Sequence, residues 1–230
     1  TDFIDNSGGV DCSDHEVNIK IGIAPMVVDG LLDQNSRNNL LASITTEVAD
    51  SVLRHNELQG QLIDIEESQA AKNIAGHSWL IKLLENKGML NRIVEKLPSA
   101  EEMNTLIANG DKLTRPELAV LVAYAKNAAT DILNQIKFID EAYFRNMLLT
   151  YFPRKLVDTP KATDYLQNHK LSNEIISTIL ANDFINTMGC LEFHQLLNND
   201  EQNAKIIMIA FIVAKYTTGL NVVWDNVEKL

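Results

Sequence analysis

The stretch Thr114–Gln135, TRPELAVLVAYAKNAATDILNQ, carries the clearest signature of the fold. Its apolar side chains recur at spacings of three and four residues, which places them on one face of an amphipathic helix. These side chains are Leu118, Leu121, Val122, Ala125, Ile132 and Leu133. Thr114 and Glu117 have the spacing of a capping box, and Pro116 stands in the first turn, where a missing N–H costs nothing. The pattern predicts a helix from about Arg115 to Gln135.

The same period runs through most of the chain and predicts one helix after another. Ser99 is expected to cap a helix with Glu102 as its partner, and Tyr151-Phe152-Pro153 to close another. Gly189 is expected to end a helix that begins near Ser172. Residues 203–217 are expected to form an apolar helix that stops before Gly219.

Residues 57–87 predict a mixed helix, with Trp79 on its inner face and Glu66 and Glu67 on its solvated face. Alternating strand patterns are absent after about Val28. We therefore expect a mainly α chain of roughly eight to ten helices in an irregular bundle or array. Residues 1–30 differ in composition from the rest, so we expect a domain boundary near residue 30.

Charge and cysteine content exclude several classes of protein. The net charge of −11 argues against nucleic acid and anionic membrane surfaces as partners. The longest apolar run, residues 206–213, is too short to span a bilayer. The two cysteines cannot form a disulfide framework and fit a reducing compartment such as the cytoplasm.

Residues 6–16, NSGGVDCSDHE, are the one glycine-centred polar motif. Asn6 before Gly8-Gly9 is suited to a tight turn, and Ser13 is suited to cap a following helix. The free amides of that helix end would favour a carboxylate or phosphate ligand. The alternative is a structural cap after a surface turn, and the spacing alone favours this alternative.

The motif Asn-x-Gly-Gly-Val-x-x-Ser-x-x-Glu resembles the signature near the end of the cofactor-binding domain in amino-acid dehydrogenases of the glutamate dehydrogenase type. Its longer form, residues 5–20, is similar to that of the large NAD-specific glutamate dehydrogenases of bacteria. Further blocks resemble the C-terminal helical region of that family, in the same order. They are Leu113–Leu121, Ala123–Lys126, Tyr151–Pro153, Glu174–Ile176, Leu180–Asn182, Gly219–Leu220 and Trp224.

The resemblance implies a role for each motif residue. Asn6 stands where the family contacts the nicotinamide ribose of NAD, and Gly8 and Gly9 leave room for the cofactor. Ser13 stands where a hydroxyl helps to bind the distal carboxylate of glutamate or 2-oxoglutarate, and Val10 where a side chain packs on the substrate's carbon chain. No catalytic residue is expected in this chain.

The resemblance also implies an activity, the NAD-dependent oxidative deamination of L-glutamate to 2-oxoglutarate and ammonia. The sequence lacks the Gly-x-Gly-x-x-Gly dinucleotide fingerprint, and the family's catalytic lysine lies upstream of the motif. We therefore expect this chain to be a C-terminal fragment of a much larger enzyme. Residues 1–30 would be the edge, or remnant, of an α/β catalytic domain, and residues 31–230 a helical domain, inactive alone.

This chain would act together with the rest of the same polypeptide. The full enzyme would be a cytoplasmic homo-oligomer that works in amino-acid catabolism. Two alternatives stay open: a non-catalytic helical assembly or regulatory module, and a dehydrogenase of another amino acid.

Other candidate residues have simpler explanations. Cys12 and His15 have half-site spacing for zinc, but a structural zinc needs four ligands, and the remaining histidines are scattered without a recurring partner. Cys190 has no basic neighbour that would lower its pKa, so it is expected to be an inert thiol. The sequence predicts no metal site.

Overall fold

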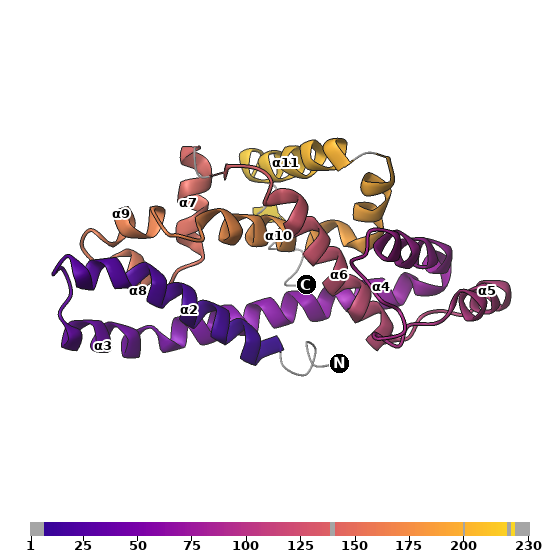
Figure 1. Ribbon diagram of the computed structural model, residues 1–230, viewed down its shortest axis with the longest axis horizontal. Helices are drawn as coiled ribbons and strands as arrows, with labels where there is room; N and C mark the ends of the chain where they lie inside the picture. The colour runs from indigo at the N-terminus through magenta and orange to yellow at the C-terminus, as the bar shows by residue number, and fades with distance from the viewer. Residues whose placement is uncertain (1–6, 139–140, 200, 220–221, 224–230) are drawn as a thin grey trace. The chain divides into compact units, whose positions relative to one another are not determined.

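The computed structural model describes residues 7–138, 141–199, 201–219 and 222–223. Over these residues it has ten α-helices and no β-strand, so the expectation of a mainly α chain is confirmed (Figure 1). The helices are α2 Ser7–Val28, α3 Gln34–Ser43, α4 Thr45–Asn86, α5 Ala100–Asn109, α6 Arg115–Leu133, α7 Ala142–Thr150, α8 Arg154–Val157, α9 Ala162–Gln167, α10 Ser172–Asn199 and α11 Glu201–Thr217. No described helix is long and apolar enough to cross a membrane.

The chain divides into two compact units, and the divisions fall inside α4 and α10. Unit 1 comprises Thr1–Gln61 and Asn134–Ile179, and unit 2 comprises Leu62–Leu133 and Leu180–Leu230. The domain boundary expected near residue 30 rests on composition and family resemblance, and it stays a prediction.

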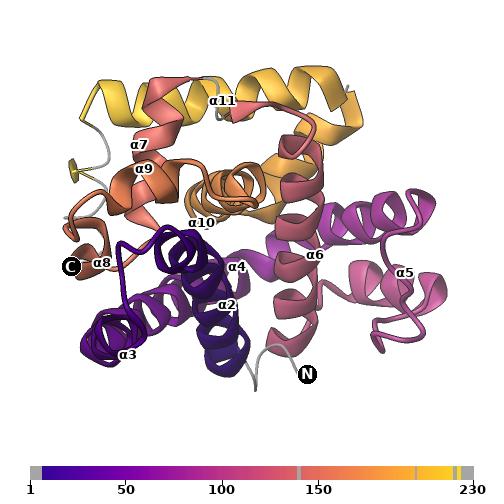
Figure 2. The ribbon, with the colours of Figure 1, turned by 60° about the vertical axis from the view of Figure 1, so that its left-hand side comes forward.

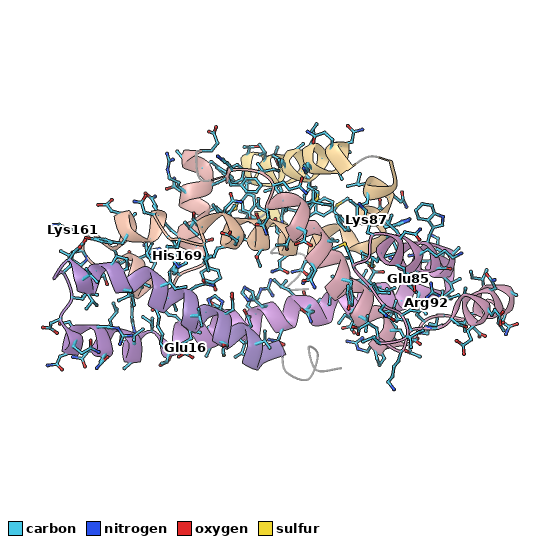
Figure 3. The ribbon with its side chains drawn as sticks, in the orientation of Figure 1. Glu16, Glu85, Lys87, Arg92, Lys161 and His169 are labelled. Atoms are coloured by element: carbon cyan, nitrogen blue, oxygen red, sulfur yellow. The ribbon has the colours of Figure 1, made fainter. Side chains whose placement is uncertain are left out.

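In unit 1, α2 packs against α9 and lies beside α3 (Figures 1 and 2). A Cβ built on Gly22 would stand 2.8 Å from Leu166 Cδ2 of α9, so a larger residue at this position would force the Leu166 side chain to move. His169, labelled in Figure 3, donates its Nε2–H to the carbonyl of Asn18 at 2.9 Å. Its Nδ1 accepts the Leu171 amide at 3.0 Å, so both ring nitrogens of this buried histidine are satisfied.

The short helix α8 is tied to the junction of α3 and α4, also within unit 1. The Arg154 amide at the start of α8 donates to the Glu47 carboxylate at 2.6 Å. The Lys155 ammonium donates to the Ser43 carbonyl at 2.9 Å. Each charged side chain therefore satisfies a backbone group that a helix end leaves without a helical partner, the Arg154 amide in α8 and the Ser43 carbonyl in α3.

In unit 2, α6 supplies much of the core, and α11 packs against it. The Lys215 ammonium of α11, mostly buried, donates to the Asp183 carboxylate at 2.6 Å and to the Thr187 hydroxyl at 3.3 Å. The turn between α4 and α5 is braced by Arg92, which bonds the Glu85 carboxylate at 2.8 and 2.5 Å and the Pro98 carbonyl at 2.9 Å (Figure 3). A bidentate guanidinium–carboxylate pair fixes orientation as well as distance.

Most of the expected helix ends are confirmed. Ser99 and Glu102 form a full capping box, α7 ends just before Tyr151, and α10 begins at Ser172. The box at α6 forms by half: the Glu117 carboxylate accepts the Thr114 amide at 2.6 Å, and the Thr114 hydroxyl also donates to that carboxylate.

Gly189 breaks the helical path as expected, with φ 84° and ψ 167°, although the chain resumes as helix directly after it.

The helix predicted over residues 57–87 is confirmed, although α4 is longer and runs from Thr45 to Asn86. Two of its side chains lie elsewhere than predicted. Trp79 is 43% exposed instead of lying in the core, and it meets the His194 ring edge-on at 4.8 Å. Glu66, expected on the solvated face, is buried. The burial of Glu66 could not be read from periodicity, because its backbone partner, the Cys190 amide, belongs to α10 and lies more than 100 residues away in sequence.

Candidate ligand-binding surface and the clusters beside it

The predicted turn at Gly8-Gly9 is wrong, because both glycines lie inside the first turn of α2. Ser13 is accordingly an interior helical residue and not an N-cap. Glycine within a helix costs about 1 kcal/mol relative to alanine, and contacts further along the helix outweigh that preference here. Asn6, the expected cofactor contact, lies outside the described residues.

Val10 and Ser13 share one face of α2, with Val17 one turn further on. All three side chains are exposed, Val10 by 56% and Val17 by 51%. The structure therefore brings together the two residues predicted to bind substrate. It presents an apolar chain and a hydroxyl on one open surface, an arrangement that suits a ligand with a carbon chain and a polar end.

A polar network lies on the side of α2 that meets Tyr151, which we call the inner face. The Tyr151 hydroxyl donates to Asp14 Oδ2 at 2.7 Å, and the Asn18 amide donates to that hydroxyl at 2.9 Å and to Asp14 Oδ1 at 3.2 Å. Burial, together with the bond to Asp14, raises the pKa of Tyr151, so this phenol stays protonated. The network fixes the rotation of α2 about its axis and so keeps Val10 and Ser13 facing outward.

His15 lies in the middle of this inner face. Its ring stacks on Tyr151 at a centroid distance of 4.4 Å and on His55 of α4 at 5.7 Å. Asp11 lies one turn earlier, and its Oδ2 accepts a hydrogen bond from His55 Nδ1 at 2.7 Å. Its other carboxylate oxygen stands 3.7 Å from His15 Nε2. We refer to Asp11, His15 and His55 as the open cluster, because His55 is half-exposed.

The electrostatics of the open cluster keep His15 neutral. Burial is the largest influence and lowers the pKa of His15; the charge of Asp11 opposes it, His55 adds to the lowering, and Asp14 opposes it further. Neither ring nitrogen of His15 has a hydrogen-bond partner among the described residues, although the side chain is only 2% exposed.

A second cluster lies in unit 2 and consists of Glu66, His77 and Cys190, all buried; we call it the closed cluster. The Cys190 amide follows the break in the helix at Gly189, and it donates to Glu66 Oε1 at 2.9 Å. His77 Nε2 stands 3.5 Å from Glu66 Oε2, and His77 Nδ1 has no partner among the described residues. Glu66 thus acts as a side-chain cap for the second half of α10, supplied from another helix.

The pKa values of the closed cluster suit this structural role. Burial alone would raise the pKa of Glu66, but the hydrogen bonds from His77 and Cys190 outweigh it and leave the pKa lowered. Burial, and then the charge and hydrogen bonding of Glu66, raise the pKa of the Cys190 thiol well above its usual value. Burial and the raised pKa of Cys190 agree with the expectation that it is an inert thiol.

Sequence reasoning missed both clusters. For the open cluster, a partial signal existed: Asp11 and His15 are four residues apart, the spacing that places side chains on one helix face. Nothing in the sequence links them to His55, and Cys12, the partner considered for His15, is exposed and lies outside the cluster.

Comparison with known proteins gives the chain its family. The family described as "Glutamate dehydrogenase, C-terminal" matches residues 110–230, which include α6 to α11. The chain belongs to this glutamate dehydrogenase family. A second family, "Bacterial NAD-glutamate dehydrogenase, catalytic domain", matches residues 1–66, so Val10 and Ser13 lie in the part that resembles a catalytic domain.

Several relatives are named "NAD-specific glutamate dehydrogenase". The protein from Halomonas elongata is 36% identical and that from Pseudomonas aeruginosa 39% identical, each over all 230 residues of this chain. The protein from Mycobacterium tuberculosis is 40% identical over 82% of the chain. The chain spans 14%, 14% and 12% of the length of these three relatives. The glutamate dehydrogenase resemblance inferred from the motif blocks is thereby confirmed.

Proposed function

We propose that this chain works as part of an NAD-dependent glutamate dehydrogenase. The reaction is the oxidative deamination of L-glutamate to 2-oxoglutarate and ammonia, with hydride transfer from the α-carbon to NAD. The observation that carries the proposal is similarity along the entire chain to proteins named NAD-specific glutamate dehydrogenase. In the proposal, the catalytic groups and the dinucleotide fingerprint belong to other parts of the enzyme, which is consistent with a chain that spans only 14% of those relatives.

The contribution of this chain to the active site is the exposed face of α2. In the proposal, the Ser13 hydroxyl donates to the distal carboxylate of the substrate, and Val10 packs on its carbon chain. Asn6, Gly8 and Gly9 lie along NAD. Exposure of Val10 and Ser13 on one face supports this arrangement, since both side chains are free to meet a ligand.

The test is Ser13→Ala in the assembled enzyme. Losing a hydrogen bond to a charged group costs about 1.5–3 kcal/mol, so the KM for glutamate should rise by roughly 10- to 150-fold. Ser68→Ala is the matched control: this serine is also exposed on a helix, and its hydroxyl bonds only the Ile65 carbonyl. Unchanged glutamate kinetics in Ser13→Ala would remove Ser13 from the substrate site.

Two assays separate the alternatives. A panel of amino acids assayed with the assembled enzyme distinguishes glutamate from another substrate. NADH production by the 230-residue chain alone is expected to be absent, and its presence would contradict the proposed division of labour. Absence of any dehydrogenase activity in the assembled enzyme would favour a helical assembly or regulatory module instead.

The proposal extends to the setting of the enzyme. We place it in amino-acid catabolism, in the cytoplasm and as a homo-oligomer. Support for a reducing compartment is the pair of free thiols, Cys12 and Cys190. Light scattering of the assembled enzyme and fractionation of the cells that make it test the last two statements.

A further inference from the structure

The open cluster has the geometry of a metal site. One carboxylate oxygen of Asp11 and one ring nitrogen each of His15 and His55 all lie within 4.8 Å of one another. Two of the ligands come from successive turns of α2 and the third from α4, within unit 1. Side chains four residues apart are neighbours on one face of a helix, and many helical metal sites take two of their ligands from such a pair.

A hydrogen-bonded network does not account for this arrangement. Asp11 satisfies His55 Nδ1 at 2.7 Å, but 3.7 Å to His15 Nε2 is too long for a hydrogen bond. Both nitrogens of the His15 ring are left without a partner among the described residues, in a side chain that is 2% exposed. A buried polar atom without a partner destabilises the fold, and a metal ion bound to His15 Nε2 would remove that cost for one nitrogen.

The charges and the solvent access of the open cluster also suit a cation. Asp11 supplies one negative charge directly, and Asp14 adds a second to the field at His15. Because His55 is half-exposed, an ion can enter from solvent, and at least one coordination position stays open to water.

We propose that Asp11, His15 and His55 bind a divalent transition-metal ion, with zinc as the best fit. Two imidazoles and one carboxylate match zinc and its neighbours in the first transition row, whereas calcium and magnesium favour oxygen ligands throughout. The ion would join α2 to α4 on the side of α2 that faces away from Val10 and Ser13. The site is therefore separate from the proposed substrate face and does not depend on the proposed activity.

Calorimetric titration of the chelator-treated 230-residue chain with zinc chloride tests the proposal. One equivalent of zinc is expected to bind. Even an outer-shell partner is worth roughly 10- to 100-fold in metal affinity, so His55→Ala and Asp11→Asn should each weaken binding by more than about 100-fold. His55 is half-exposed, so its variant is expected to fold even where a change at buried His15 is not tolerated.

Cys12→Ser is the matched control, since Cys12 neighbours the cluster in sequence but is exposed and outside it. Its zinc affinity should equal that of the unmodified chain. Cobalt substitution gives a second readout: a site of nitrogen and oxygen ligands shows visible ligand-field bands without a thiolate charge-transfer band. Absence of saturable zinc binding, unchanged affinity in both His55→Ala and Asp11→Asn, or a thiolate band would each overturn the proposal.

Discussion

The open cluster of unit 1 and the closed cluster of unit 2 combine histidine with carboxylate in opposite surroundings. In the closed cluster, the Glu66 carboxylate is occupied by the Cys190 amide, the neighbouring thiol is held protonated, and all three side chains are buried. In the open cluster, one carboxylate faces two imidazoles and can satisfy only one of them, and solvent reaches the site through His55.

The difference separates a structural role from a binding role. A metal ion at the closed cluster would have to displace a backbone hydrogen bond, deprotonate a thiol whose pKa is raised, and enter without a solvent route. At the open cluster it would displace the side-chain hydrogen bond between Asp11 and His55 but no backbone hydrogen bond, and it would satisfy an unpartnered nitrogen of His15. Donor types alone do not decide which cluster binds a ligand; the partners already present and the access of solvent do.

The largest effect is expected from Glu66→Ala. Removing this buried carboxylate leaves the Cys190 amide and His77 without their acceptor, and each buried group left unsatisfied costs about 1–3 kcal/mol. Glu67→Ala is the matched control, because its exposed pairs with Lys112 and Arg115 contribute at most about 1 kcal/mol. Urea unfolding measures both. Equal effects of the two variants would remove the structural role given to Glu66.

Gly189→Ala should follow in size. Residue 189 has φ 84°, and an added Cβ would stand 3.0 Å from Glu66 Oε1, so the variant is expected to lose about 2–3 kcal/mol. Gly60→Ala provides the contrast: a Cβ there meets no atom within 4 Å, and the helix interior should gain up to about 1 kcal/mol. Shifts of the same sign in thermal unfolding would contradict this account of the break.

Part of this contrast was readable from the sequence. Gly189 was expected to break a helix from its residue type, and Ser99, Thr114 and Tyr151 marked helix ends because capping and the conformation before proline are local effects. The burial of Glu66 could not be predicted, since its acceptor role exists only once α10 breaks beside it.

The N-terminal motif shows the same limit for the candidate site. Gly8-Gly9 favours a turn locally, yet the segment is helical, because the inner face of α2 is fixed by Tyr151 and His55, which are distant in sequence. Resemblance identified the family of this part of the chain correctly, since residues 1–66 match the bacterial catalytic domain, although local reasoning gave the motif the wrong conformation.

The smallest effect is a difference in pH dependence. The pKa of His15 is lowered from 6.5 in the folded chain. As the pH decreases below about 6.5, the unfolded chain therefore takes up the proton first, and the folded state becomes less stable. The pKa of Glu66 is lowered from 4.5, so its contribution is complete above that pH and is lost only as the pH falls further, through the folded pKa.

His15→Phe keeps the ring stack with Tyr151 and removes the titrating group. The slope of stability between pH 7 and 5 should become shallower by at most about 1.4 kcal/mol per pH unit, the limit for one proton. His169 and His194 have lowered pKa values as well, so a residual slope is expected. Urea midpoints across the range provide the measurement, and an unchanged slope would show that His15 is not held neutral by the fold.

The most direct test of the distinction between the two clusters is anomalous diffraction. Crystals of the chain soaked in zinc chloride and measured at the zinc absorption edge should show an anomalous peak between Asp11, His15 and His55 and none beside Glu66, His77 and Cys190. A peak at the closed cluster, or none at the open cluster in crystals that diffract well after soaking, would contradict the account.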